Sequence, residues 1–148
     1  MLELDEAMDF YERTKRVKGY SLFYCPETND FECVMENIGN KNVIPFIDSY
    51  SVCLRIIEMY LNTPQKQKYR EECKQKMKRE KNKVVSFLWF FECIDGAYNF
   101  DLYERIKVEK ELKRWCANYN ILYSPLEKYS VDPEENKWII EKFGPIPE

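Results

Sequence analysis

The chain has 148 residues, 33% of them charged, and a formal net charge of −3. It has no histidine, which excludes Ser-His-Asp and Cys-His catalytic arrangements within it and removes the commonest ligand of transition metals. Aromatic residues make up 16% of the chain, enough for a sizeable core, and this disfavours disorder. We therefore expect a folded protein with no cofactor and no bound metal.

The six cysteines are spread along the chain without a CxxC pair, so reduced cysteines are favoured over a disulfide framework. Two alternatives stay open: an exposed thiol at Cys25, and a Cys25–Cys33 pair if the strand register aligns them. No apolar run approaches the ~20 residues of a membrane-spanning helix, and the acidic start MLELDEAMDF is unlike a signal peptide. These features predict a soluble, unexported protein of the cytoplasm that makes no membrane contact.

The predicted fold class is α+β, a helix-rich single domain with one small antiparallel β-hairpin. The domain is expected to cover residues 1–148. Its parts in chain order are an N-terminal helix (1–18), a hairpin with an extended segment (20–47), a helical body (48–123) and a C-terminal helix (132–144).

The first two helices are predicted from apolar residues that recur at helical spacing. The first covers residues 2–17 and ends before Gly19, with the stripe Leu4, Met8 and Tyr11. The second begins at Asp48 or Ser49 and runs for about 14 residues. Its buried stripe is expected to consist of Tyr50, Cys53, Leu54, Ile57 and Leu61.

Between these helices, the segments Tyr20–Cys25 and Phe31–Glu36 flank the turn cluster Pro26–Asp30. This pattern predicts a β-hairpin with a five-residue loop. A further turn is predicted over residues 39–42. Val43–Ile47 is expected to be short and extended, and Pro45 places it at a sheet edge if it pairs at all.

The second half of the chain holds two more helices and one ambiguous segment. Asp101–Asn118 is the clearest helix, and the last helix is predicted from a cap at Asp132 to a terminator at Gly144. The run Val84–Ile94 is apolar at almost every position, so it fits a strand and a helix equally well. Asp95 and the glycine after it are expected to end that run.

The run Thr63–Lys83 holds nine of the 23 Lys and Arg residues against three glutamates, a balance of +6 that leaves −9 for the rest of the chain. Thr63-Pro64 suits a helix start, and Tyr69, Cys73 and Met77 form a narrow apolar seam. The bases would then face outward. They suit an acidic protein surface, including one on another copy of the chain, or nucleic-acid phosphates, or they are simply solvated lysines.

The second candidate feature is the bulky run at residues 87–91, which no single face of a helix or strand can hide. Burial beneath flanking helices is the default, whereas partial exposure would create a contact surface of the kind that carries binding energy. The candidate partner-binding residues are seven bases and four aromatic residues: Lys66, Lys68, Arg70, Lys74, Lys78, Arg79, Lys81, Trp89, Phe91, Tyr98 and Tyr103.

Carboxylates support only a weak enzymatic interpretation, and no catalytic residue is assigned. Asp101, Glu111 and Lys113 match the D…ExK order of some metal-dependent nucleases in letters alone, because the last two point to different faces of a helix. Glu92 and Asp95 bracket the aromatic run, where partial burial could shift the pKa of a carboxyl group. A role as caps at the protein surface explains these two residues equally well.

Several segments together carry a resemblance: FYCPETNDFECV, then VIPFIDSYSVCLRIIEMYL, then SFLWFFECID, then Tyr103 with Trp115-Cys116 and Ile121. Over about residues 20–123 the chain resembles an uncharacterised family of small bacterial proteins with the pattern GAFRRFKD…WY…RW[CL]. The glycine and paired arginines of that pattern are absent here, where Val85–Phe91 stands instead. The resemblance implies an architecture and no mechanism.

The leading hypothesis is a non-catalytic intracellular interaction protein, such as a bacterial or phage accessory factor that binds or inhibits a partner protein. The alternative is a nucleic-acid-associated regulator that binds through the basic helix over residues 66–83. A carboxylate- and metal-dependent enzyme comes third.

Overall fold

The structure is a computed structural model that describes residues 1–32, 42–94 and 98–146, leaving out the side chains of residues 91–94 and 98. The protein is α+β and helix-rich, as predicted. Its helices are α1 (Leu4–Thr14), α2 (Ser49–Leu61), α3 (Gln67–Arg79), α4 (Lys83–Ile94), α5 (Tyr98–Asn118) and α6 (Pro133–Phe143), with the 3-10 turn η2 (Pro64–Lys66) before α3.

The predicted hairpin is confirmed, but its loop is residues 26–29 rather than 26–30, because Asp30 pairs with Cys25. A third strand joins the hairpin. Strands β2 (Phe23–Cys25) and β3 (Asp30–Glu32) pair antiparallel, and β4 (Ile44–Pro45) pairs antiparallel with the other side of β2. The strand that carries Pro45 therefore lies at an edge, where a missing N–H costs least. The predicted strand residues 33–36 and turn residues 39–41 lie outside the described part of the chain.

A second, parallel pair of strands was not expected from the sequence. Strand β1 (Leu2–Glu3) pairs with β5 (Tyr123–Ser124), so the first residues are extended rather than helical. Helix α1 also ends at Thr14, three residues before the predicted end. The prediction was wrong at the first boundary because the pairing that holds β1 extended comes from a segment more than a hundred residues away.

The helix starts follow from local caps. The Asp48 carboxylate accepts a hydrogen bond from the Ser51 backbone N–H at 3.1 Å, and Asp132 accepts one from the Glu134 N–H at 2.8 Å. Gly144, with φ of 81°, follows the end of α6. The ambiguous run after Lys83 is helical, and its predicted break at Asp95 lies outside the described residues.

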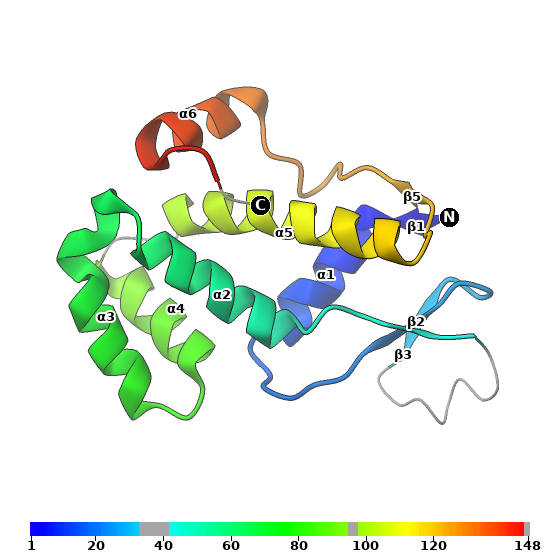
Figure 1. Cartoon of the computed structure of the whole chain (residues 1–148), viewed down its shortest axis with the longest axis horizontal. Helices are drawn as coiled ribbons and strands as arrows, with labels where there is room; N and C mark the ends of the chain where they lie inside the picture. Colours follow the sequence, from blue (N-terminus) through cyan, green and yellow to red (C-terminus); the bar gives the residue numbers. More distant parts are fainter. Residues whose placement is uncertain (33–41, 95–97, 147–148) are drawn as a thin grey trace.

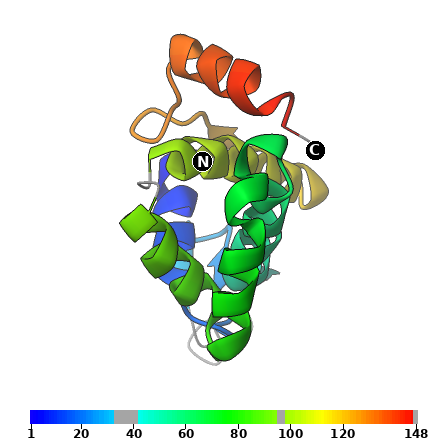
Figure 2. The same ribbon diagram turned by 90° about the vertical axis from the view of Figure 1, so that its left-hand side faces the viewer.

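Figure 1 shows α2 and α5 side by side at the centre of the molecule. Helix α1 packs against both of them, and α6 lies along the outer side of α5. Helices α3 and α4 form an antiparallel hairpin beside α2, at the end of the molecule away from the small sheet (Figures 1 and 2).

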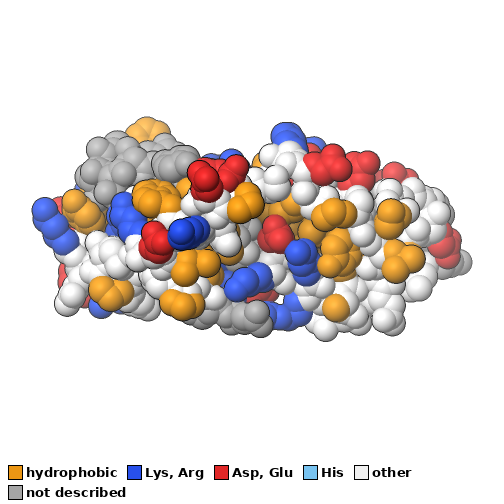
Figure 3. All heavy atoms as spheres, turned by 90° about the horizontal axis from the view of Figure 1, so that it is seen from above, with side chains coloured by type: hydrophobic (Ala, Val, Ile, Leu, Met, Phe, Trp, Pro, Cys, Tyr) orange, Lys and Arg blue, Asp and Glu red, His pale blue; other side chains and the backbone are white. Residues whose placement is uncertain are grey.

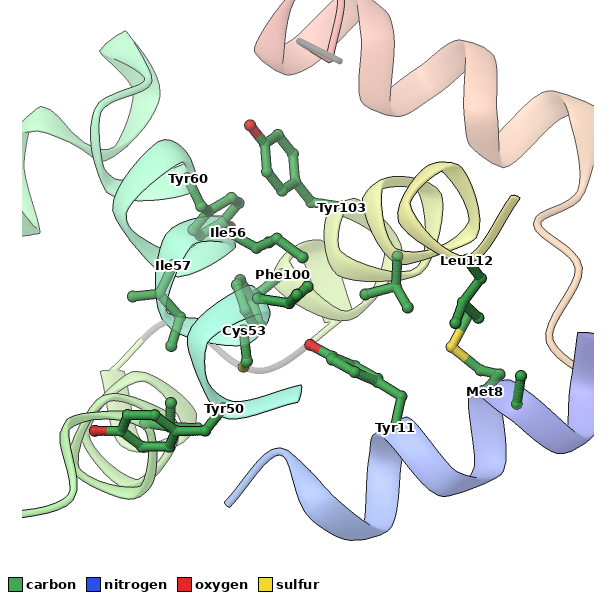
Figure 4. Packing of buried hydrophobic residues seen from close by; sticks show 14 of the residues in the cluster. Met8, Tyr11, Tyr50, Cys53, Ile56, Ile57, Tyr60, Phe100, Tyr103 and Leu112 are labelled. Atoms are coloured by element: carbon green, nitrogen blue, oxygen red, sulfur yellow. The ribbon is translucent and has the colours of Figure 1, made fainter. Parts of the chain in front are cut away.

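One cluster of buried side chains includes residues from Leu2 to Ile146. Figure 4 shows its centre, where Met8 and Tyr11 of α1 meet the apolar faces of α2 and α5. The sheet is joined to this cluster by Trp115 of α5, whose indole N–H donates to the Pro45 carbonyl at 2.9 Å. No helix of the described residues is long and apolar enough to cross a membrane.

The described cysteines whose side chains are given are all buried, and no disulfide joins them to one another: Cys25, Cys53, Cys73 and Cys116. The alternative of an exposed thiol at Cys25 is therefore wrong, since the residue is only 1% exposed. The side chains of Cys33 and Cys93 lie outside the described part, so a Cys25–Cys33 pair stays untested.

Candidate partner-binding surface

Helix α3 is held to the protein by the narrow apolar seam that the sequence predicts. Cys73 and Met77 are buried, and Tyr69 is partly buried against the same cluster. Because these residues are four positions apart, they occupy one side of the helix only. The other sides are left to charged residues.

The bases on those sides are exposed. In the described part of the chain, no ion pair involves the exposed bases of the basic run: Lys68, Lys74, Lys76, Lys78, Arg79, Lys81 and Lys83. Elsewhere the pattern is different: on the face that carries α5 and α6, positive and negative side chains are interspersed (Figure 3). An exposed cation without a counter-ion is available to an anionic partner.

Two of the predicted bases instead make contacts within the protein. The ammonium group of Lys66 is buried over the rings of Tyr60 and Phe143, at 5.6 and 5.7 Å from their centroids. The guanidinium Nε of Arg70, which is partly buried, donates to the Leu61 carbonyl at 2.7 Å. Lys66 thus secures η2 to the core and does not belong to an outer contact surface, which corrects the prediction for that residue.

The aromatic run is divided by the helical geometry of α4. Phe87 is buried, Phe90 is partly buried, and Trp89 is 74% exposed. Partial exposure of the run, the second of the two predicted outcomes, is therefore what the structure shows. An exposed tryptophan is unusual because its large apolar surface remains in contact with water.

The other aromatic candidates do not join Trp89. Tyr103 is 2% exposed and stacks edge-on with Tyr60 in the core, so its predicted role in an outer contact surface is wrong (Figure 4). The side chains of Phe91 and Tyr98 lie outside the described residues.

A groove of about 690 Å³ runs between the last turn of α3 and the outer side of α4. Its apolar residues are Val85, Trp89 and Phe90. Its charged and polar lining consists of Lys76, Arg79, Glu80, Asn82 and Ser86. The structure thus brings together the two features that the sequence offered separately, a basic helix and an exposed aromatic residue.

Residues on opposite sides of α3 belong to different hollows. Lys76 and Arg79 line the groove beside α4, whereas Lys74 and Lys78 line a smaller hollow of about 240 Å³ towards α2. The smaller hollow also contains the carboxylate of Glu58. The predicted base set therefore falls on two faces, and Lys76 is a groove residue that the prediction missed.

A cluster of ionisable side chains, separate from the two hollows, is enclosed in the core. The Glu104 carboxylate accepts hydrogen bonds from Tyr11 (2.8 Å), Lys15 (2.9 and 3.1 Å) and the Cys53 thiol (3.4 Å). Burial raises the pKa of Glu104 and, together with the Glu104 charge, raises those of Tyr11 and Cys53. Figure 4 shows the Tyr11 hydroxyl pointing towards Cys53, deep between the helices.

This buried cluster joins three helices and lines none of the grooves described above. Within the described residues, no group of three or more histidine, cysteine or acidic side chains is placed to hold a metal ion. Of the D…ExK residues, Asp101 pairs with Arg105 and Lys113 with Glu109, all along α5. Glu92 and Asp95 lie outside the part whose side chains are described.

The site thus defined is a basic and aromatic groove on a helical hairpin of an α+β protein. Comparison of the chain with protein-family models, with curated proteins and with solved structures gives no match. The resemblance to the family of small bacterial proteins therefore stays a prediction, and function has to be argued from the surface itself.

Proposed function

We propose that this protein is a non-catalytic interaction protein, an accessory factor that occupies an acidic surface of a partner protein through α3 and α4. The observation that carries the proposal is the set of exposed cations on α3 that have no ion-pair partner among the described residues and lie beside an exposed tryptophan. Aromatic residues and arginine are enriched at protein interfaces, and exposed lysines attract an acidic partner through their charge.

An acidic protein surface is favoured over nucleic acid for two reasons. Outside the basic run the chain carries −9, so a long polyanion would be repelled wherever it extended past α3, which is about 20 Å long. In addition, seven of the nine bases are lysines, which lack the forked geometry with which arginine binds phosphate. An exposed tryptophan between cations also suits a single-stranded nucleic acid, so the test has to separate the two.

The test is capture of partners from the native cell, with and without nuclease. Replacing Lys74, Lys78 and Lys81 with glutamine should reduce the captured partner, and association should slow by about tenfold at low salt. A matched variant with Lys18, Lys137 and Lys142 changed to glutamine loses the same charge elsewhere and should capture as much as the wild type.

Nuclease treatment decides the class of partner. Capture that survives nuclease and is lost when Lys74, Lys78 and Lys81 are replaced supports the proposal. Capture that disappears with nuclease, or micromolar and salt-sensitive binding to DNA or RNA at ~150 mM salt, would replace it with the nucleic-acid function. Equal capture by the two variants would exclude a role for α3.

A further inference from the structure

We infer that the groove between α3 and α4 binds a short acidic segment of the partner, with an apolar side chain against Trp89 and carboxylates at Lys76 and Arg79. This inference rests on the proposed function and specifies the site and the ligand. In this inference the groove residues contact the ligand, whereas the other bases of the helix only attract it through their charge.

The walls of the groove are fixed before a ligand arrives. Asn82 accepts a hydrogen bond from the Val85 N–H at 3.0 Å and so caps α4, while the Ser86 hydroxyl donates to the Lys76 carbonyl at 3.2 Å. Behind these bonds the hairpin is closed by buried side chains: Cys73, Met77, Val84 and Phe87. A preformed site binds with a small entropic cost of ordering.

The turn of the hairpin is also anchored to the body. The Asn82 side-chain amide donates to the Arg16 carbonyl after α1, and the Lys83 N–H donates to the Tyr50 hydroxyl of α2 at 3.1 Å. The turn beside the groove is therefore attached to α2 and to the segment after α1, and the shape of the groove does not depend on the hairpin alone.

The apolar part of the groove lining comes from α4. Trp89 and Phe90 present aromatic surface next to Val85. Tryptophan truncation at protein interfaces typically gives large losses of affinity, because its broad ring excludes water from neighbouring contacts. A volume of about 690 Å³ is that of an ordinary ligand pocket, enough for a few side chains and too small for a folded domain.

The charged residues at the edge of the groove, which we call its rim, favour a ligand of negative charge. Lys76 and Arg79 are exposed without an ion pair in the described residues, and the Lys76 ammonium lies 5.2 Å from the centre of the Phe90 ring. Glu80 also lines the groove, so the rim carries +1. This favours a segment that has carboxylates on one side and apolar side chains on the other, since the phosphates of a nucleic acid would meet Glu80 as they followed the groove.

The probe is a helical peptide of about 12 residues, with glutamates on one face and leucine and phenylalanine on the other. Three matched probes separate its parts: glutamate to glutamine, apolar residues to serine, and single-stranded oligothymidylate of equal length. Anisotropy of a dye on the probe gives the dissociation constant with the full-length protein. In nitrogen-15 NMR spectra, the Trp89 indole N–H signal, assigned from its loss in Trp89→Ala, reports the place of binding.

Only the acidic, apolar peptide should bind well, and it should shift the Trp89 indole signal while leaving that of Trp138 in place. Trp89→Ala should weaken binding about 30-fold. Lys76→Gln with Arg79→Gln should weaken it about tenfold, whereas Lys74→Gln with Lys78→Gln, the same charge on the other side of α3, should change it less than about threefold at ~150 mM salt.

Several results would overturn the inference. The first is an equal loss of peptide affinity in the two double variants, and the second is binding of the peptide without a shift of the Trp89 indole signal. The third is no binding of the peptide at all, and the last is stronger binding of the oligonucleotide than of the peptide. The first two would leave the proposed function standing, because an acidic ligand would still bind the basic helix by charge alone. The last would also replace the proposed function. A folded spectrum for Trp89→Ala shows that its loss of binding is local.

Discussion

At the scale of single residues, the least expected pair is Lys15 and Glu104. The first helix was predicted with its charged residues outside the apolar stripe, although Lys15 follows Tyr11 at the spacing of that stripe. In the structure, Lys15 is 3% exposed and Glu104 is 1% exposed, and their side chains bond to each other between the end of α1 and α5. The burial of Lys15 could not be inferred from neighbouring residues, because the partner that makes burial tolerable lies 89 residues away.

Lys15→Met tests the energetic role of this pair. It leaves the Glu104 carboxylate buried with the hydroxyl of Tyr11 and the thiol of Cys53, which cannot balance its charge. We expect the free energy of unfolding to fall by about 3–5 kcal/mol, measured by guanidinium denaturation.

The double variant Lys15→Met with Glu104→Gln serves as the control, because it removes both charges. It should recover a large part of the loss. If the single and double variants were equally unstable, the methylene packing of Lys15 rather than its charge would be the stabilising contribution.

At the scale of elements, an element could be predicted from the sequence when the residues that determine it are adjacent in the chain. The helix that starts after Asp48 and the hairpin around Pro26–Asp30 were predicted because a cap and a turn are written in a few adjacent residues. The run that became α4 could not be assigned, since apolar residues at every position have no period. Its state is set by the Asn82 cap and by packing against α3 and α2.

Two neighbouring aromatic residues of α4 should therefore behave in opposite ways. Phe87→Ala removes a fully buried ring and should lower the free energy of unfolding by about 3–5 kcal/mol. Trp89→Ala removes an exposed ring and should change it by no more than about 0.5 kcal/mol. Thermal or guanidinium unfolding checks both, and a large loss in Trp89→Ala would mean that this side chain is covered in the folded protein.

The candidate site was predicted in part for the same reason. Lys78 and Arg79 are exposed as expected, because charge density is a property of the sequence itself. Trp89 is exposed as well, although burial beneath flanking helices was the default expectation for its run. Lys66 and Tyr103 were assigned wrongly, since nothing near them in the chain shows that they pack against Tyr60. The groove itself could not be predicted, because it lies between two helices whose relative position is set by packing.

At the scale of the whole molecule, the N-terminal segment is tied to the segment that precedes α6. The Asp5 carboxylate accepts hydrogen bonds from the backbone N–H groups of Glu127, Lys128 and Tyr129, at 3.0 to 3.2 Å. Burial raises the pKa of Asp5, but the three N–H groups and the charge of Lys128 outweigh it, and the pKa lies below its usual value. Together with the β1–β5 pair, this contact joins the start of the chain to the segment between α5 and α6.

Asp5→Ala should lower the free energy of unfolding by about 1–3 kcal/mol, because three N–H groups lose a charged acceptor. A carboxyl group with a lowered pKa stabilises the fold above the pKa of the unfolded chain, and this contribution is lost as the pH falls. The difference from the wild type should therefore shrink below about pH 4.

Glu127→Ala removes a charge from the same exposed loop without touching the contact, so it should be nearly neutral. Urea unfolding over a range of pH makes the comparison. A difference between Asp5→Ala and the wild type that did not change with pH would mean that the carboxylate charge contributes nothing.

The three tryptophans occupy three separate regions of the molecule. Trp89 is in water on the α3–α4 hairpin, Trp115 is enclosed between α5 and the sheet with its ring edge-on to Phe46, and Trp138 lies half-exposed on α6. Indole emission depends on polarity, so each ring has its own intrinsic fluorescence. Variants that keep one tryptophan and replace the others with phenylalanine turn the chain into its own reporter. They allow the loosening of the hairpin, the sheet and the last helix to be followed separately, without an attached dye.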